Sequence, residues 1–290
     1  MKKSKIELAK LKIISYFSDS SKRIFGKKDI ALILENNRTN WKLSYSMSLT
    51  DFLDFLLNST QLKKHYFQLG NRPITRYSWG DVSIYPLLLS LEDKAYFSHY
   101  SAMYFNNLTD QIPKIIYINL EQTPKPRPRS PLEQSNIDKA FKNKQRVSNN
   151  YLDYENFRVC ILNGKFTGGL GAIEMNLSGG EKILVTGIER TLIDITVRPV
   201  YAGGVYEVSR AYQAAKEKVS SNRISAMLKT LDYIYPYHQA IGFYMKRAGY
   251  RETVLDLFRD FGIKYDFYLT HNMKQTEYDK EWRLYYPKGF

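Results

Sequence analysis

Apolar positions in the first part of the chain recur at the spacing of amphipathic helices. Residues 5–18 place their apolar side chains mostly on one face, and residues 27–37 repeat the pattern. A third helix is expected to begin after Ser48, because a serine followed three positions later by Asp51 is a variant of the capping box. The pattern therefore predicts three short helices in succession.

Two short extended runs follow, at residues 65–69 and 75–79, and the sequence GNRP between them supplies turn residues. Three helices followed by a two-stranded ribbon is the element order of a winged helix-turn-helix. Arg72 is then expected at the tip of the ribbon, the wing, and Arg76 just behind it.

A new unit is predicted from residue 91 onward. Ser98 is a candidate N-cap for a helix over residues 99–106, and β-branched runs predict strands at 114–120 and 157–162. Alternating apolar and polar residues over 171–186 predict a hairpin. Two late strands close the chain, and before them helices are predicted at about 187–197, 204–218, 221–231, 236–248 and 252–261.

Mixed strands and helices, with the helices gathered late in the chain, predict an α+β fold. We expect an N-terminal winged helix-turn-helix domain at residues 1–90. Residues 91–290 are expected to form a mixed α/β domain with a helical C-terminal part. Residues 235–290 are rich in Tyr and Phe, and the sequence assigns this tail no role.

The length and amino-acid composition of the chain exclude several classes of protein. The chain has 290 residues, of which 43% are hydrophobic, so it can bury a core, and no apolar run approaches the ~18 residues of a membrane span. Glu7 and Lys10 interrupt the lysine-rich start, which favours a cytoplasmic protein over an exported one. Cys160 is the single cysteine and the four histidines lack ligand spacing, so we expect no metal site and no cofactor.

The net charge of +14 is concentrated early in the chain. Residues 1–92 carry 15 Lys and Arg against 8 Asp and Glu, which is half of the excess in a third of the length. A basic N-terminal third favours double-stranded DNA as a partner, with general solubility charge as the alternative. The candidate DNA contacts are Lys27, Lys28, Arg38, Lys42, Lys63, Lys64, Arg72 and Arg76.

A second basic stretch surrounds the proline-rich sequence EQTPKPRPRSPLEQSN, because residues 121–150 carry 7 basic and 3 acidic residues. The prolines exclude regular helix and sheet and favour extended backbone. This loop over residues 121–146 is a second nucleic-acid contact or a solvated loop, and the sequence leaves both readings open.

The sequence VTGIERTLIDITVRPVYAGG, residues 185–204, gathers ionic groups beside a double glycine. Thr186 is a candidate N-cap, and Glu189 three residues later would complete a capping box. Arg190 with Asp194, and Asp194 with Arg198, are pairs at helical i,i+4 spacing. These residues predict a capped helix with paired charges, ended by a proline and a tight turn.

The same segment, followed by VYEVSRAYQAA, resembles the signature of the AbiEi-family antitoxins of type IV toxin–antitoxin (abortive infection) systems. The earlier segment YFSHYSAMYFNNLTDQIPKIIYI also resembles that family, so the resemblance covers about residues 95–215. The residues that match the motif are Thr186, Glu189, Arg190, Thr191, Leu192, Asp194, Arg198, Tyr201, Gly203 and Gly204.

The resemblance implies a protein of two parts. A winged helix-turn-helix would bind inverted repeats in the promoter of its own operon and repress it. A C-terminal antitoxin domain would neutralise a cognate nucleotidyltransferase toxin without a stable complex. The chain departs from compact members of the family by a long connection between its second and third helices and by the extension over residues 235–290.

Enzymatic activity is not expected. A nucleotidyltransferase needs a Gly-Ser pair for phosphate and an Asp-x-Asp pair for metal ions, and the chain contains neither. Arginine beside carboxylates at Glu189, Arg190 and Asp194 could cradle a phosphate, but we favour buried ion pairing for these residues. The alternatives are a phage-defence or mobile-element transcriptional regulator without a toxin partner and, third, an enzyme acting on nucleotides or RNA.

Overall fold

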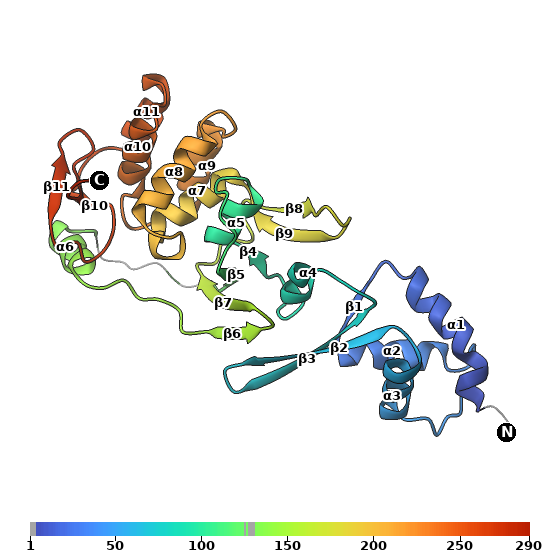
Figure 1. Ribbon diagram of the computed structural model, residues 1–290. Helices are drawn as coiled ribbons and strands as arrows, with labels where there is room; N and C mark the ends of the chain where they lie inside the picture. The colour runs from blue at the N-terminus through green and yellow to red at the C-terminus, as the bar shows by residue number, and fades with distance from the viewer. Residues whose placement is uncertain (1–3, 125, 127–130) are drawn as a thin grey trace. The chain divides into compact units, whose positions relative to one another are not determined.

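The computed structural model describes residues 4–124, 126 and 131–290, and helices and strands mix along the chain as an α+β fold (Figure 1). The chain divides into two compact units. Unit 1 comprises the described part of residues 1–93 together with residues 176–183. Unit 2 comprises the described part of residues 94–175 together with residues 184–290.

Unit 1 contains the three predicted helices and the predicted ribbon. Its strands form an antiparallel sheet in the order β1-β3-β2, so the last strand lies between the other two. The sequence pattern did not predict the short strand β1 or the helix α4. The elements are α1 (Lys5–Asp19), β1 (Ile24–Phe25), α2 (Lys27–Asn37), α3 (Leu49–Ser59), β2 (Leu62–Leu69), β3 (Arg72–Trp79) and α4 (Ile84–Leu89).

Local interactions fix the ends of these elements. Ser48 Oγ accepts a hydrogen bond from the Asp51 amide at 3.1 Å, and Asp51 Oδ2 accepts one from the Ser48 amide at 3.1 Å. The predicted capping box of α3 is therefore confirmed. Leu69 pairs with Arg72 across the hairpin, and Gly70 adopts φ +55° in the turn, which glycine adopts at little cost. Figure 1 shows the β2–β3 hairpin extending away from the three helices.

An aromatic core holds the helices of unit 1 on its sheet. The rings of Phe17 and Trp79 stack with centroids 4.8 Å apart, and both side chains are fully buried. Trp79 Nε1 donates to Ser18 Oγ at 3.1 Å, which satisfies the indole N–H. Phe52 and Trp41 stack at 5.9 Å in the same core. The predicted apolar faces of α2 and α3 pack in this core, whereas α1 packs through Ala9, Ile13 and Phe17 and leaves the predicted face residues Leu8 and Leu11 exposed.

Unit 2 is built on a sheet with the strand order β6-β7-β5-β4-β9-β8. Its central pair, β5 and β7, is parallel, with Ile115 opposite Arg158 and Glu121 opposite Gly164. The strands are β4 (Tyr96–Phe97), β5 (Ile115–Glu121), β6 (Tyr151–Tyr154), β7 (Phe157–Gly164), β8 (Ala172–Asn176) and β9 (Lys182–Thr186).

Helices gather on the later part of unit 2, as the sequence pattern predicts (Figure 1). Residues 125 and 127–130 of the proline-rich loop lie outside the described part of the chain. The remaining elements are α5 (His99–Phe105), α6 (Gln134–Lys142), α7 (Ile188–Val197), the 3-10 turn η1 (Pro199–Tyr201), α8 (Val205–Ala215), α9 (Ser221–Leu231), α10 (Tyr237–Arg247), α11 (Glu252–Arg259), β10 (Phe267–Tyr268), β11 (Thr276–Asp279) and β12 (Leu284–Pro287).

The aromatic tail completes the core of these helices. Trp282 is fully buried against α10, where a Cβ on Gly242 would lie 2.2 Å from the indole ring. Only glycine permits that approach. Tyr244 of α10 stacks on Tyr212 of α8 at 5.1 Å, and Phe267 is fully buried in the same cluster. Residues 235–290 are therefore an integral part of the fold of unit 2.

None of the helices in the described ranges has the length and apolar character that crossing a bilayer requires.

Candidate functional site

A buried ion pair lies at the centre of the motif segment. Arg190 Nε donates to Asp194 Oδ1 at 2.8 Å, and the two residues are only 4% and 6% exposed. Burial by itself lowers the pKa of Arg190, but the Asp194 carboxylate outweighs it and the pKa lies above its usual value. The predicted pair thus forms, in the interior of the unit.

The second predicted pair, Asp194 with Arg198, does not form between these described side chains. Arg198 Nη1 donates instead to the Arg146 carbonyl at 2.9 Å. Asp194 Oδ2 has no hydrogen-bond partner among the described residues. The prediction was wrong because α7 ends at Val197, so Arg198 lies outside the helix, where i,i+4 geometry no longer applies.

The predicted capping box at the start of α7 is also wrong. Gly187 is the N-cap, and Thr186 is the buried last residue of β9. The Thr186 and Thr191 hydroxyls lie 2.9 Å apart, and Thr191 Oγ1 donates to the Thr186 carbonyl at 3.0 Å. Glu189 Oε1 accepts from the Ser220 amide at 3.1 Å, so its carboxylate binds at the start of α9 and not at its own helix.

A glycine-rich turn after β7 holds a carboxylate that the sequence did not single out. Glu121 accepts from the amides of Thr167 at 2.8 Å and Gly168 at 2.9 Å, and from Gly169 at 3.3 Å. The Thr167 and Tyr96 hydroxyls also donate to it. Burial raises the pKa of Glu121, but these hydrogen bonds outweigh it and leave the pKa below its usual value. The turn is a backbone nest for an anion, already occupied by Glu121.

The same turn positions the ion pair. Arg190 Nη1 donates to the Leu170 carbonyl at 2.6 Å and to Thr167 Oγ1 at 3.2 Å. Gly171 has φ +76°, and a Cβ there would lie 2.7 Å from Arg190 Cβ. The backbone can pass this close to Arg190 only because residue 171 has no side chain. A Thr-Gly-Gly-x-Gly run was the available sequence signal for this turn.

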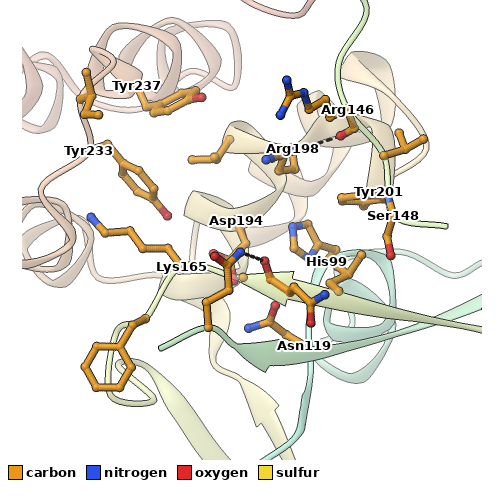
Figure 2. A pocket seen from close by; sticks show the side chains of 18 of the residues that line it. His99, Asn119, Arg146, Ser148, Lys165, Asp194, Arg198, Tyr201, Tyr233 and Tyr237 are labelled. Atoms are coloured by element: carbon orange, nitrogen blue, oxygen red, sulfur yellow. Dashed lines mark hydrogen bonds between the residues drawn. The ribbon is translucent and has the colours of Figure 1, made fainter. Parts of the chain in front are cut away.

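A cavity of about 740 Å³ opens beside the ion pair, entirely within unit 2 (Figure 2). It lies between α7, the end of β7 and the turn before α10. Its polar and aromatic lining includes His99, Asn119, Arg146, Ser148, Lys165, Arg190, Asp194, Arg198, Tyr201, Tyr233, Tyr235 and Tyr237. The volume falls within the range of small-molecule sites, about 300–1,000 Å³.

His99 forms part of the cavity wall in an unusual conformation. It is 8% exposed and has φ +52°, a left-handed backbone that costs energy for a residue with a Cβ. Ser98 occupies the predicted N-cap position of α5, but its side chain makes no capping hydrogen bond, and its Oγ lies 2.9 Å from His99 Nδ1. The ring stands edge-on to Tyr201 at 5.4 Å. Burial lowers the pKa of His99 to about 4, so the imidazole is neutral at pH 7.

Four of the ten residues of the sequence motif line this cavity, and six do not. Arg190, Asp194, Arg198 and Tyr201 line it, and Tyr201 OH accepts from the Ser148 amide at 2.7 Å. Leu192 is fully buried in the core, and the other motif residues hold the surrounding backbone: Thr186, Glu189, Thr191, Gly203 and Gly204. Gly203 and Gly204 have φ of +79° and +96°, which explains the double glycine before α8.

In unit 1 the predicted DNA contacts separate into two groups. Arg38 is 8% exposed and donates to the carbonyls of Ser44 at 2.7 Å and Met47 at 3.2 Å. Arg76 is half-buried and donates to the Ser90 carbonyl at 2.7 Å. Both guanidinium groups donate hydrogen bonds to backbone carbonyls elsewhere in unit 1, so these two residues do not belong to an exposed basic face.

Lys63 and Arg72 are exposed but have partners. Lys63 pairs with Asp81, and Arg72 pairs with Glu92. The remaining four candidates are exposed, and no side-chain partner for them occurs within the described ranges: Lys27, Lys28, Lys42 and Lys64. Lys27 and Lys28 are the first two residues of α2, and Lys64 lies on the hairpin strand β2.

Across the described part of the chain, no group of three or more His, Cys, Asp or Glu side chains is arranged to hold a metal ion.

Comparisons with known proteins establish the fold and nothing finer. No model of a known protein family matches the chain, and no functionally described protein matches it in sequence. The structure is similar to the crystal structure of the RV2827C protein from Mycobacterium tuberculosis, with a TM-score of 0.58 and 13% sequence identity. The similarity covers 96% of this chain and 91% of that chain, so the α+β arrangement is shared over nearly the whole length of both.

Proposed function

We propose that the chain is a type IV antitoxin whose unit 1 is a winged helix-turn-helix. In this proposal unit 1 binds inverted repeats in the operon's own promoter, and unit 2 neutralises a cognate nucleotidyltransferase toxin. The element order of unit 1 supports the winged helix. A helix, a short strand, two helices and a hairpin follow one another, and the short strand pairs with the second hairpin strand.

The observation that carries the DNA proposal is the placement of the unpartnered lysines. Lys27 and Lys28 are the first two residues of α2, and Lys64 lies on the hairpin strand β2. Lysines at a helix start and on a wing are suited to phosphates on either side of a groove. Positive charge that serves only solubility would not need to lie at the start of α2 and on the hairpin.

The side chains of the third helix, α3, restrict the contacts that this helix can make to DNA. α3 contains no Lys or Arg, and its Asp51 and Asp54 are exposed. Phosphate binding therefore falls to α2 and the hairpin, and base contacts from α3 come from neutral polar side chains. Thr50 and Asn58 are the exposed residues of that kind on α3.

Promoter binding by the full chain tests this assignment. Lys28→Ala and Lys64→Ala should each weaken binding to the upstream region of the operon and reduce the salt slope of log K by about 1. Lys229→Ala is the matched control, because Lys229 is exposed on α9 of unit 2. An affinity and a salt slope unchanged in both unit 1 variants, measured by fluorescence anisotropy, would exclude this face.

The antitoxin role is tested separately from repression. A full-length Lys27→Ala/Lys28→Ala/Lys64→Ala variant, impaired in DNA binding, is co-expressed with the product of the neighbouring gene. Restored growth supports neutralisation by unit 2. Toxicity that persists at wild-type antitoxin levels, or a neighbouring gene without Gly-Ser and Asp-x-Asp motifs, favours a regulator without a toxin partner.

A further inference from the structure

The proposed promoter binding by unit 1 does not use the cavity of unit 2, and two polar atoms of this cavity lack hydrogen-bond partners among the described residues. Asp194 uses Oδ1 for Arg190, and its Oδ2 accepts no hydrogen bond from the described residues. His99 uses Nδ1 for Ser98, and its Nε2 has no hydrogen-bond partner within those ranges. Both side chains are more than nine-tenths buried and line the cavity. Neither atom belongs to the fully enclosed polar atoms that lack a partner, so both open onto the cavity and are available to hydrogen-bond a ligand there.

The net positive charge of the cavity wall favours an anionic ligand. Arg146, Lys165, Arg190 and Arg198 face two carboxylates, those of Asp194 and Asp232, an excess of two positive charges. Arg190 forms an ion pair with Asp194, and Lys165 donates hydrogen bonds to the carbonyls of residues 231 and 232. The Arg146 guanidinium is exposed and has no hydrogen-bond partner in the described chain. Guanidinium groups bind phosphate oxygens in a bidentate manner, so Arg146 and Arg198 are suited to a phosphate group.

Tyrosine side chains also line the cavity. Tyr233 and Tyr237 come from the turn before α10 and the first residue of that helix, with rings 5.3 Å apart, and Tyr235 lies between them in sequence (Figure 2). Tyrosine faces stack on nucleobases. A phosphate-binding wall and a stacking wall in one cavity match the two halves of a nucleotide.

We propose that this cavity binds a nucleotide, with its phosphate at Arg146 and Arg198 and its base against the tyrosines of the 233–237 turn. Asp194 Oδ2 accepts hydrogen bonds from the ligand's hydroxyl or amino groups, and His99 Nε2 supplies a further polar contact. The ligand is a free mononucleotide or the terminal nucleotide of an RNA strand. The site is distinct from the lysines of unit 1 and does not depend on the proposed promoter binding.

Calorimetric titration of the full chain tests the site. The probes are ATP, GTP, CTP and UTP singly, adenosine, inorganic pyrophosphate, and a 5′-phosphorylated RNA tetranucleotide. We expect at least one mononucleotide or the tetranucleotide to bind, more tightly than adenosine or pyrophosphate. Arg146→Ala should weaken this binding about tenfold, which corresponds to about 1.4 kcal/mol. Tighter binding of the tetranucleotide than of every mononucleotide identifies a strand end as the ligand, and the reverse identifies a free nucleotide.

Two further variants make the test specific. Arg223→Ala removes an exposed arginine of α9 that does not line the cavity, and it should leave binding unchanged. Tyr233→Leu should weaken nucleotide binding but not the weaker binding of pyrophosphate. The proposal is overturned if no probe binds at about 1 mM, or if Arg146→Ala and Arg223→Ala have equal effects. The Lys27→Ala/Lys28→Ala/Lys64→Ala variant should keep nucleotide binding, so loss of promoter binding and loss of this site are separable.

Discussion

The two units place their charges in opposite ways. In unit 1, Lys28 and Lys64 stand in solvent without side-chain partners in the described chain. In unit 2, Arg190 and Asp194 are almost fully buried and bonded to each other at 2.8 Å. Solvated lysines contribute little to folding and remain available to a polyanion, whereas buried ions are costly unless every partner is present. We therefore expect the exposed lysines of unit 1 to act in binding and the buried pair of Arg190 and Asp194 to act in the stability of unit 2.

The most severe test of this contrast is Asp194→Ala. It leaves the Arg190 guanidinium buried without its carboxylate, so unit 2 should lose about 3–5 kcal/mol of unfolding free energy. The measurement is denaturant unfolding with hydrogen-exchange mass spectrometry of peptides from unit 2. The control is Asp153→Ala, since Asp153 is an exposed carboxylate 3.9 Å from Arg158. It should cost less than about 1 kcal/mol.

A double variant sharpens the same point. Replacing both partners, Arg190→Met with Asp194→Leu, should recover much of the stability, because no uncompensated charge remains. Equal losses in Asp194→Ala and Asp153→Ala would contradict the contrast between the units.

The glycine turn gives the next largest effect. Gly171→Ala combines a left-handed backbone with a Cβ 2.7 Å from Arg190 Cβ, and we expect a loss of about 3 kcal/mol. Gly168→Ala is the matched control, because φ is +65° there but no atom lies within 4 Å of the added Cβ. It should cost only about 1 kcal/mol. If thermal unfolding ranks the two variants equally, close packing against Arg190 is not what requires glycine at position 171.

Within unit 1, Arg38 and Arg76 depart from the solvated pattern, and Arg38 is the more buried of the two. Arg38→Ala removes the hydrogen bonds to the Ser44 and Met47 carbonyls, so unit 1 should lose about 2 kcal/mol. Lys28→Ala should change stability by less than about 0.5 kcal/mol, as is usual for exposed positions. Arg38→Ala should therefore be less stable in urea but keep its promoter affinity. Lys28→Ala should keep its stability but bind the promoter more weakly. A stable Arg38→Ala variant with a reduced salt slope would return Arg38 to the DNA-binding set.

Sequence reasoning succeeded where an interaction is local. The capping box of Ser48 and Asp51 and the pair of Arg190 and Asp194 join residues three and four positions apart, as their spacing predicts. The same spacings wrongly predicted Thr186 with Glu189 and Asp194 with Arg198, because spacing does not show at which residue α7 begins and ends. The helical and extended runs were found for the same reason, because periodicity is a local property. Burial was not accessible in this way: nothing in the spacing indicates that Arg38 is enclosed while Lys28 is not.

The cavity depends on contacts that no local pattern contains. Glu121 meets Thr167 across 46 positions of sequence, and His99 meets Tyr201 across more than a hundred. Short strands such as β1 were missed because two residues give too little periodicity, and their pairing with a distant strand decides their conformation. The motif residues indicated where unit 2 concentrates its ionic groups, but not which of them would line a cavity.

The smallest expected effect concerns pH and the carboxylate in the glycine turn. The pKa of Glu121 is lowered in the folded state, because hydrogen bonds from Thr167, Gly169 and Tyr96 outweigh its burial. Its contribution to stability is therefore complete above the ordinary glutamate pKa of about 4.3 and is lost as the pH falls through the lower folded-state value. Because the carboxylate is partly exposed, we expect a contribution of about 1 kcal/mol or less.

Glu121→Gln cannot titrate, so its unfolding free energy should fall less than that of the wild type when the pH is lowered from about 7 to about 3.5. Urea unfolding at several pH values gives the dependence of the unfolding free energy on pH for each protein. The titration of His99 and of the other groups that both proteins share cancels in the difference between them. Glu217→Gln, at an exposed position on the surface of unit 2, should follow the wild type. Parallel pH curves for all three proteins would mean that the glycine turn holds Glu121 without favouring its charge, and the contrast between solvated and enclosed ions would then rest on Arg190 and Asp194 alone.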